Sequence, residues 1–255
     1  MKKHYLSALV LALFTATASA QITTKEQAKA HIEALRVADT EAADDAISAV
    51  NAASNEAGYN QAVKDFYQAI NGSKVYFTNS ARGAKNYLTL SPAFAAAGDR
   101  ADTPTAENVF ELEYDEANNS FALSHAVTGR ALKNLPGFNN PVPTTAEEGG
   151  LYSFVVSGQN NTFSLRNDAT GGTHNVLHLA GDKTGAQYNV VRWSAGSSAL
   201  TDPSTWAIES AENVTDNQLK AAALQRLLSF DLTSNIGQGL GERQISAEVK
   251  PIMDK

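Results

Sequence analysis

The spacing of apolar residues divides the chain into three zones, and the first zone has a helical pattern. Apolar side chains recur there at i, i+4, i+7 and i+11, the spacing of one helix face. They are Tyr59, Val63, Phe66 and Ile70. Thr24 and Gln27 match a capping box at a helix start, and Asn71-Gly72 is typical of a helix end. We therefore expect a hairpin of two helices over residues 21–72, with a break near residues 54–58.

Over residues 73–211 the pattern changes to short β-type runs separated by Gly, Asn, Asp, Ser and Pro. Such punctuation is typical of an all-β barrel or sandwich. A helical pattern returns after Thr215 and Gln218, which form a second capping-box pair. The apolar residues that follow can share one helix face: Leu219, Ala222, Ala223, Leu227 and Phe230. We expect a helical or flexible tail over residues 212–255.

An internal repeat runs through the middle zone. Residues 118–123 read Asn-Asn-Ser-Phe-Ala-Leu, and residues 160–165 read Asn-Asn-Thr-Phe-Ser-Leu. An aromatic-x-apolar triplet occurs three times, at Phe110–Leu112, Tyr152–Phe154 and Trp206–Ile208. A glycine followed by a leucine-rich run also occurs three times, at Gly83, Gly129 and Gly172. The repeat predicts three units of about 45 residues, each with a strand, a glycine turn, a leucine-rich strand, a loop and an aromatic strand.

The large residues of each unit stand at alternate positions, so they share one face of a strand, which must be buried. Three such units can close a barrel and leave few open edges. This pattern resembles the β-trefoil, specifically the ricin-type lectin-like family of bacterial secreted proteins, over residues 74–211. The third unit carries much of the likeness, in residues 175–179, 190–193 and 204–209. We expect a mainly β fold, a β-trefoil between a helical hairpin and a C-terminal helix. Another all-β sandwich or barrel is the alternative.

The resemblance implies a shallow sugar site in the third unit. Lectins of this family hold sugar hydroxyls with an Asp and an amide, and they pack an aromatic face on the sugar. The matching residues of this chain are Asp168, Asn175, Asn189 and Trp193. The family's Gln-x-Trp signature is absent from all three units, so the resemblance supports the fold more than the function. The alternative is that Asp168 and the asparagines make turns and that Trp193 belongs to the core.

The first twenty residues have the features of a secretory signal. Lys2 and Lys3 precede a short apolar run, and small residues follow up to Ala20. The run is about half of the roughly 20 residues that a membrane span needs. We expect residues 1–20 to be removed and the protein to be periplasmic, cell-surface or extracellular. The chain has no cysteine, so its stability must come from buried apolar area.

Charge and motifs disfavour several classes of function. The formal net charge is −7, and the charged residues are scattered along the chain. Nucleic acid is therefore a disfavoured partner, since phosphate contacts need clustered basic residues. No membrane insertion is expected. No nucleophile elbow, His-Glu-x-x-His helix or cysteine nucleophile occurs, so we predict no catalytic residue, no cofactor and no enzyme activity. His174 and His178 would lie about 13 Å apart along a strand, too far to share a metal ion. No metal site is predicted.

Two functions are favoured over a third, a complete enzyme such as a glycosidase. The first is an exported, non-catalytic module that binds a glycan or a cell-surface polysaccharide. Binding at its single shallow site would be weak. Useful binding would therefore need several such sites, or tethering of the module to an enzyme or a surface. The second is a structural or protein-interaction module whose trefoil has lost sugar binding. Its helical appendages would then dock on another surface protein.

Overall fold

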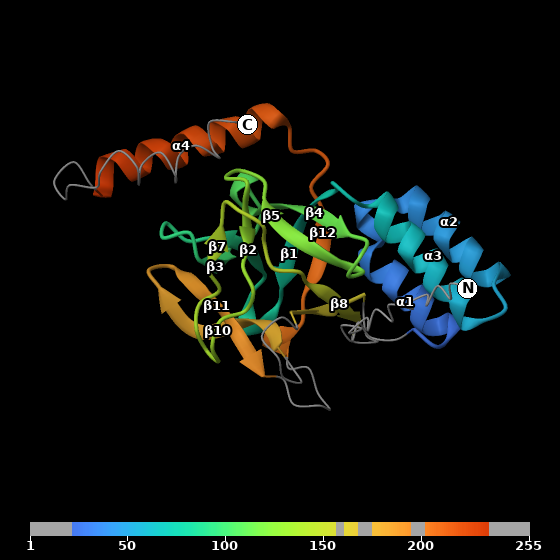
Figure 1. Cartoon of the computed structure of the whole chain (residues 1–255). Coiled ribbons are helices and arrows are strands. Elements are labelled where there is room, and N and C mark those ends of the chain that lie inside the picture. The colour runs from blue at the N-terminus through green and yellow to red at the C-terminus, as the bar shows by residue number, and fades with distance from the viewer. Residues whose placement is uncertain (1–21, 157–160, 168–174, 195–201, 235–255) are drawn as a thin grey trace, which may run out of the picture.

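The computed structural model describes residues 22–156, 161–167, 175–194 and 202–234 (Figure 1). Within these residues the chain is mainly β, with four α-helices and twelve strands. The helices are α1 (Lys25–Leu35), α2 (Thr40–Ala52), α3 (Glu56–Ala69) and α4 (Asp216–Ser234). The strands are β1 (Lys74–Asn79), β2 (Asn86–Leu90), β3 (Ala96–Arg100), β4 (Val109–Asp115), β5 (Ser120–His125), β6 (Arg130–Leu132), β7 (Thr144–Thr145), β8 (Ser153–Val156), β9 (Phe163–Arg166), β10 (Asn175–Thr184), β11 (Gln187–Ser194) and β12 (Ala207–Ser210). The sequence-based prediction of a mainly β fold is confirmed.

The first zone contains three α-helices, not the two that the sequence pattern predicts. The additional break is a short 3-10 helix, η1 (Arg36–Ala38), after which α2 begins. Asp39 has an extended backbone, and its side chain accepts a hydrogen bond from the backbone N–H of Ala42. Asp39 therefore caps a new helix start, a signal that the surrounding alanine-rich sequence obscures. The expected break near residues 54–58 is present, with Asn55 capping α3.

The strands form one antiparallel sheet that curls into a ring. Ladders join β12 to β1, β1 to β4, β4 to β5, and β8 to β9. Two isolated bridges complete the ring, Phe121 with Tyr152 and Phe163 with Trp206. The remaining strands pair as β2–β3, β6–β7 and β10–β11. The ring therefore leaves few strand edges open, as expected for a closed barrel.

The repeated aromatic residues of the sequence fill the inside of the ring. All of them are buried, and they are Phe77, Phe110, Phe121, Tyr152, Phe154, Phe163 and Trp206. The ring centroid of Phe154 lies 4.8 Å from that of Phe163 and 5.2 Å from that of Phe121, both edge-on. Edge-on contacts between aromatic rings add to the stabilisation from burial. The predicted glycine turns are present at Gly83 and Gly129, both with positive φ, and Gly172 lies outside the described residues.

The helices cover two sides of the ring (Figure 1). Helices α1–α3 share one apolar core with the strands, and the Tyr67 and Phe121 ring centroids lie 5.1 Å apart. Helix α4 packs on a second apolar cluster through Leu219, Ala222 and Ala223. None of the helices in the described part of the chain is both long enough and apolar enough to cross a membrane.

Candidate functional site

Three of the four predicted site residues lie on the β10–β11 hairpin, and Asp168 lies outside the described residues. The antiparallel register pairs Val176 with Trp193 and His178 with Val191. Side chains directly opposite each other share a face of the sheet, as do alternate residues of one strand. Trp193 and His178 are therefore diagonal neighbours on one face, while Asn175 points to the other.

Asn175 and Asn189 are both held by contacts within the hairpin. The Asn175 side chain is almost fully buried, and its Oδ1 accepts hydrogen bonds from Nε and Nη2 of Arg192. Asn189 Oδ1 accepts a hydrogen bond from Thr184 Oγ1 at 2.8 Å. Asn189 also stands four residues from Trp193, a separation of about 13 Å along a strand. The described structure therefore does not bring these two amides together with Trp193 in one exposed site.

Trp193 forms part of an aromatic cluster at the surface. Its ring stacks on His178 with a centroid distance of 4.8 Å, and it lies 4.7 Å from the ring of Phe138. Phe138 is 56% exposed, whereas Trp193 is half-buried and His178 is buried. We call Phe138 and Trp193 the aromatic platform.

The loop that carries Phe138 is fastened to β11 at Arg192. The backbone N–H of Asn139 donates to the Arg192 carbonyl at 2.9 Å, and the Arg192 N–H donates to the Asn140 carbonyl at 3.2 Å. Arg192 Nη1 donates to the Pro136 carbonyl at 3.0 Å. One residue therefore holds both ends of a five-residue loop. This contact fixes the exposed Phe138 ring beside Trp193.

His178 supports the platform from below as a neutral ring. Burial lowers its pKa to about 4, and the nearby positive charge of Arg82 acts in the same direction. The ring Nδ1 forms a 2.8 Å hydrogen bond with Ser204 Oγ. Since the ring is uncharged near neutral pH, it stacks under Trp193 as a flat, weakly polar surface.

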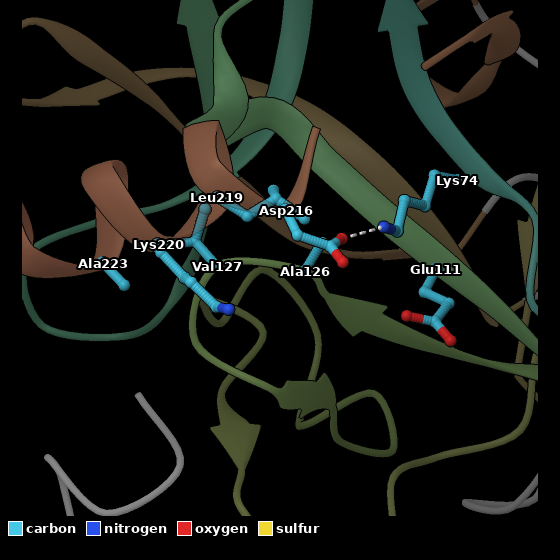
Figure 2. Close-up of a pocket in the computed structure, with 8 residues that line it drawn as sticks. All are labelled: Lys74, Glu111, Ala126, Val127, Asp216, Leu219, Lys220 and Ala223. Carbon is cyan, nitrogen blue, oxygen red and sulfur yellow. Dashed lines mark hydrogen bonds and ion pairs between the residues drawn. The ribbon is translucent and has the colours of Figure 1, made fainter. Parts of the chain in front are cut away.

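A separate cavity of about 210 Å³ lies under the start of α4 (Figure 2). Its floor is apolar, with Ala126 and Val127 from the ring side and Leu219 and Ala223 from the helix. Figure 2 shows Lys74 reaching Asp216 at the rim, and the two charged groups are 3.1 Å apart. This ion pair ties α4 to β1.

Metal chemistry finds no support in the described part of the chain, where no three His, Asp or Glu side chains are arranged to hold a metal ion. His178 is engaged with Ser204 and Trp193, and His174 lies outside the described residues.

Comparison with known proteins gives only distant structural likenesses. No protein-family model matches the chain, and no curated protein matches it by sequence. A mosquitocidal holotoxin is 14% identical, with a TM-score of 0.45, over 55% of this chain and 16% of the holotoxin chain. The BEL β-trefoil is 14% identical, with a TM-score of 0.43, over 55% of this chain and 94% of its own. An agglutinin from Rhizoctonia solani is 14% identical, with a TM-score of 0.43, over 55% of this chain and 95% of its own. Identity at this level assigns no function.

Sequence reasoning found Trp193 but missed Phe138 and Arg192. An exposed phenylalanine within Gly137-Phe138-Asn139-Asn140 is a signal that could have been used, because large apolar residues are unusual in such turn-rich loops. Arg192 carries no comparable signal, since its role depends on contacts with a loop about 55 residues earlier.

Proposed function

We propose that this chain is an exported, non-catalytic glycan-binding module with a β-trefoil fold, and that the aromatic platform is its binding site. The trefoil consists of three four-stranded units, β1–β4, β5–β8 and β9–β12. The first and last strands of each unit form the ring, and the middle two form a hairpin. The ladders and bridges around the ring support this division, as do the repeated aromatic positions.

The exposure of Phe138 is the observation that carries the proposed site. Of the four large apolar side chains that are exposed in the described residues, Phe138 is the only aromatic one. A flat aromatic ring in contact with a second ring offers a surface on which the C–H face of a sugar can exclude water. The Arg192 contacts hold this surface in place before a ligand arrives, and such preorganisation reduces the entropy lost on binding.

The affinity of one such site is expected to be low because the platform is shallow. A Kd near a millimolar corresponds to about −4 kcal/mol. If several copies of the module are linked, or if the module is attached to a surface, one bound site holds the next site close to the glycan. The effective concentration for the second binding event is then higher. We therefore expect binding to be measured more readily on dense glycan surfaces than with free monosaccharides.

A glycan array with three proteins tests the proposal. The wild type is compared with Phe138→Ala and with Val37→Ala, which shortens another exposed apolar side chain, 43% exposed, on the N-terminal helices. We expect the wild type and Val37→Ala to bind the same glycans and Phe138→Ala to lose them. Absence of any bound glycan, or unchanged binding by Phe138→Ala, would reject the site.

A protein-interaction module is the second candidate, and α4 is the feature that favours it. Leu224 and Leu228 stand one helical turn apart and are 59% and 60% exposed. A photo-crosslinking residue at position 221, which is exposed and one helical turn before Leu224, would identify a protein bound at this face. If this candidate is correct, Leu224→Asp with Leu228→Asp abolishes the crosslinked complex, and Phe138→Ala leaves it unchanged.

A further inference from the structure

A second surface hollow, of about 390 Å³, lies over the outer face of β4, β5 and β6. Its floor is made of small residues, Ala122, Ser124, Gly129 and Ala131. Glu113 stands directly across from Ala122 in the β4–β5 ladder, so its side chain shares that outer face. We call this hollow the acidic hollow.

The acidic hollow owes its negative charge to two separate segments. Glu113 comes from β4, and Glu147 and Glu148 come from the loop before β8. All three side chains are exposed, and none forms an ion pair within the described part of the chain. Asp115 of β4 also lines the hollow, which makes four acidic residues, and no lysine or arginine is among the lining residues. Such a lining favours a positively charged occupant.

Two glycines bring the acidic loop close to the sheet. A Cβ atom at Gly149 would lie 2.5 Å from the Ala131 Cβ, and one at Gly150 would lie 2.5 Å from the backbone nitrogen of Asn134. Real Cβ atoms do not approach so closely, so only glycine allows the loop to press against β6. This approach is what joins Glu147 and Glu148 to the same hollow as Glu113.

Ser124 offers a buried polar group inside the acidic hollow. Ser124 as a whole residue is only 7% exposed, and alternation along β5 puts its side chain on the same outer face as Ala122. In the described residues no hydrogen bond is made by its hydroxyl. The Ser124 hydroxyl is not one of the fully buried atoms that lack a partner, so it is accessible from the hollow. A ligand there with a hydrogen-bonding group of its own can bond to it.

We propose that the acidic hollow binds the ammonium group of an amino sugar, that is, a glycan unit with a free rather than an acetylated amine. This inference rests on the proposed glycan-binding function and adds a second site to it. The carboxylates pair with the ammonium group, Ser124 exchanges a hydrogen bond with a ring hydroxyl, and the small side chains of the floor leave room for one face of the sugar ring. A bare metal ion is disfavoured, since no three acidic or histidine side chains in the described chain are arranged to hold one.

Isothermal titration calorimetry with three probes tests the inference. The probes are a tetramer of β-1,4-linked glucosamine, its fully N-acetylated counterpart, and tetralysine. The variants are Ser124→Ala and a Glu113→Gln, Glu148→Gln double variant. Glu26→Gln with Glu212→Gln is the matched control, because both of these carboxylates are exposed and lie outside the acidic hollow. Thermal melting confirms that each variant is folded.

We expect the glucosamine tetramer to bind the wild type and to bind the acidic double variant about tenfold more weakly, since a charge-assisted contact is lost. Ser124→Ala binds it severalfold more weakly, and the control variant binds it normally. Added salt weakens this binding because exposed charges are screened. Absence of tetramer binding, equal binding of the acetylated tetramer, or no effect of the double variant would overturn the inference. Equally tight binding of tetralysine would overturn the assignment to a sugar.

Phe138→Ala separates this inference from the proposed function. The acidic hollow predicts that Phe138→Ala binds the glucosamine tetramer as the wild type does. Glycan-array binding that requires Phe138, without any tetramer binding, would reject the acidic hollow and leave the aromatic platform standing. Tetramer binding lost in both Phe138→Ala and the acidic double variant would place the ligand elsewhere and overturn the separate site.

Discussion

His31 is buried where the helices meet the strands. Its Nδ1 lies 3.1 Å from the Tyr67 hydroxyl in a hydrogen bond, and burial lowers its pKa to about 4. Burial also raises the pKa of Tyr67. Both groups are therefore neutral near pH 7, and burial disfavours the charged form of His31.

Acid should weaken the fold through His31. In the unfolded chain a histidine has a pKa of about 6.5, so between pH 6.5 and 4 the unfolded state binds more protons than the folded state. The contribution of His31 to the free energy of unfolding is fully present above pH 6.5. It falls by about 3 kcal/mol as the pH falls from 6.5 to 4. Urea unfolding at a series of pH values measures the loss. His178, whose pKa is also lowered to about 4, adds a loss of the same sign.

His31→Gln isolates the contribution of His31, because glutamine can bond to Tyr67 but does not titrate. We expect its free energy of unfolding to fall less than that of the wild type between pH 7 and pH 4. Parallel pH profiles for the two proteins would contradict this assignment.

Arg192 should stabilise the aromatic platform. Arg192→Lys keeps the positive charge but loses the planar fork that bonds to Asn175 and the Pro136 carbonyl together, since all three donors of lysine are on one nitrogen. We expect a loss of about 1–2 kcal/mol in the free energy of unfolding and faster amide hydrogen exchange over residues 136–140. Arg100→Lys, at an exposed arginine, is the control. Equal exchange rates in this loop for both variants would show that Arg192 does not hold it.

The residues of the platform differ in how far sequence could reveal them. Trp193 was found because it belongs to the repeat, and its half-buried position allows both the platform and the core interpretations. Asn175 matched the resemblance, but it is bonded to Arg192. Phe138 was missed because its contact with Trp193 joins segments far apart in the chain. Repeats show which positions are equivalent, whereas a site depends on which loops meet.

Among the elements, α4 is fastened near its middle by Arg226, in addition to the Lys74–Asp216 ion pair and the apolar contacts near its start. Arg226 Nη1 lies 2.6 Å from Glu107 Oε2, and Nη2 donates to the Leu90 and Ser91 carbonyls at 3.0 and 2.6 Å. The guanidinium also lies 5.1 Å from the centre of the Phe94 ring. Burial raises the pKa of Glu107, whereas the charge of Arg226 opposes that rise.

Arg226→Met should loosen α4 without unfolding the ring. Methionine keeps the apolar stem but removes every charged contact and leaves Glu107 partly buried without its cation. We expect a loss of about 2–3 kcal/mol and faster hydrogen exchange over residues 216–229. Lys220→Met, at an exposed lysine of the same helix, is the control. Unchanged exchange in Arg226→Met would mean that the apolar contacts of Leu219, Ala222 and Ala223 hold α4 alone.

Helix boundaries followed from capping chemistry where it stood out in the sequence. The Thr24–Gln27 box and the Thr215–Gln218 pair both form the expected hydrogen bonds. The start of α2 was missed, although Asp39 is a favoured N-cap residue, because apolar spacing continues across it. Local side-chain chemistry can end a helix that the apolar pattern alone would extend.

For the whole molecule, the aromatic repeat was the strongest source of prediction. Alternating large residues predicted a buried face, and the aromatic residues at those positions are buried inside the ring. The acidic hollow had no equivalent signal, since Glu113 and Glu147 approach each other only through the close packing of Gly149 and Gly150. The sequence pattern predicted separate zones whose helices pack on the next domain, and residues from α1–α3 and from the strands do belong to one core.

This shared core predicts one cooperative unfolding transition. The chain has two tryptophans, Trp193 and Trp206, and both lie in the strand region. Their fluorescence therefore reports on the strands, whereas ellipticity at 222 nm reports mainly on the helices. Since Tyr67 of α3 packs against Tyr114 and Phe121, unfolding the helices would expose part of the core of the ring. We expect both probes to give the same midpoint in thermal unfolding, as two-state behaviour requires.

Tyr67→Ala tests whether this contact couples the two parts. Removing a buried aromatic side chain costs about 3 kcal/mol or more, and here the loss falls on the boundary between helices and strands. We expect the ellipticity midpoint to drop below the fluorescence midpoint in this variant. In Tyr59→Ala, which lies on the same helix and contacts Lys25, the two midpoints should stay together. Separate midpoints already in the wild type would show that the helices and the strands fold as independent domains, as the sequence zones suggest.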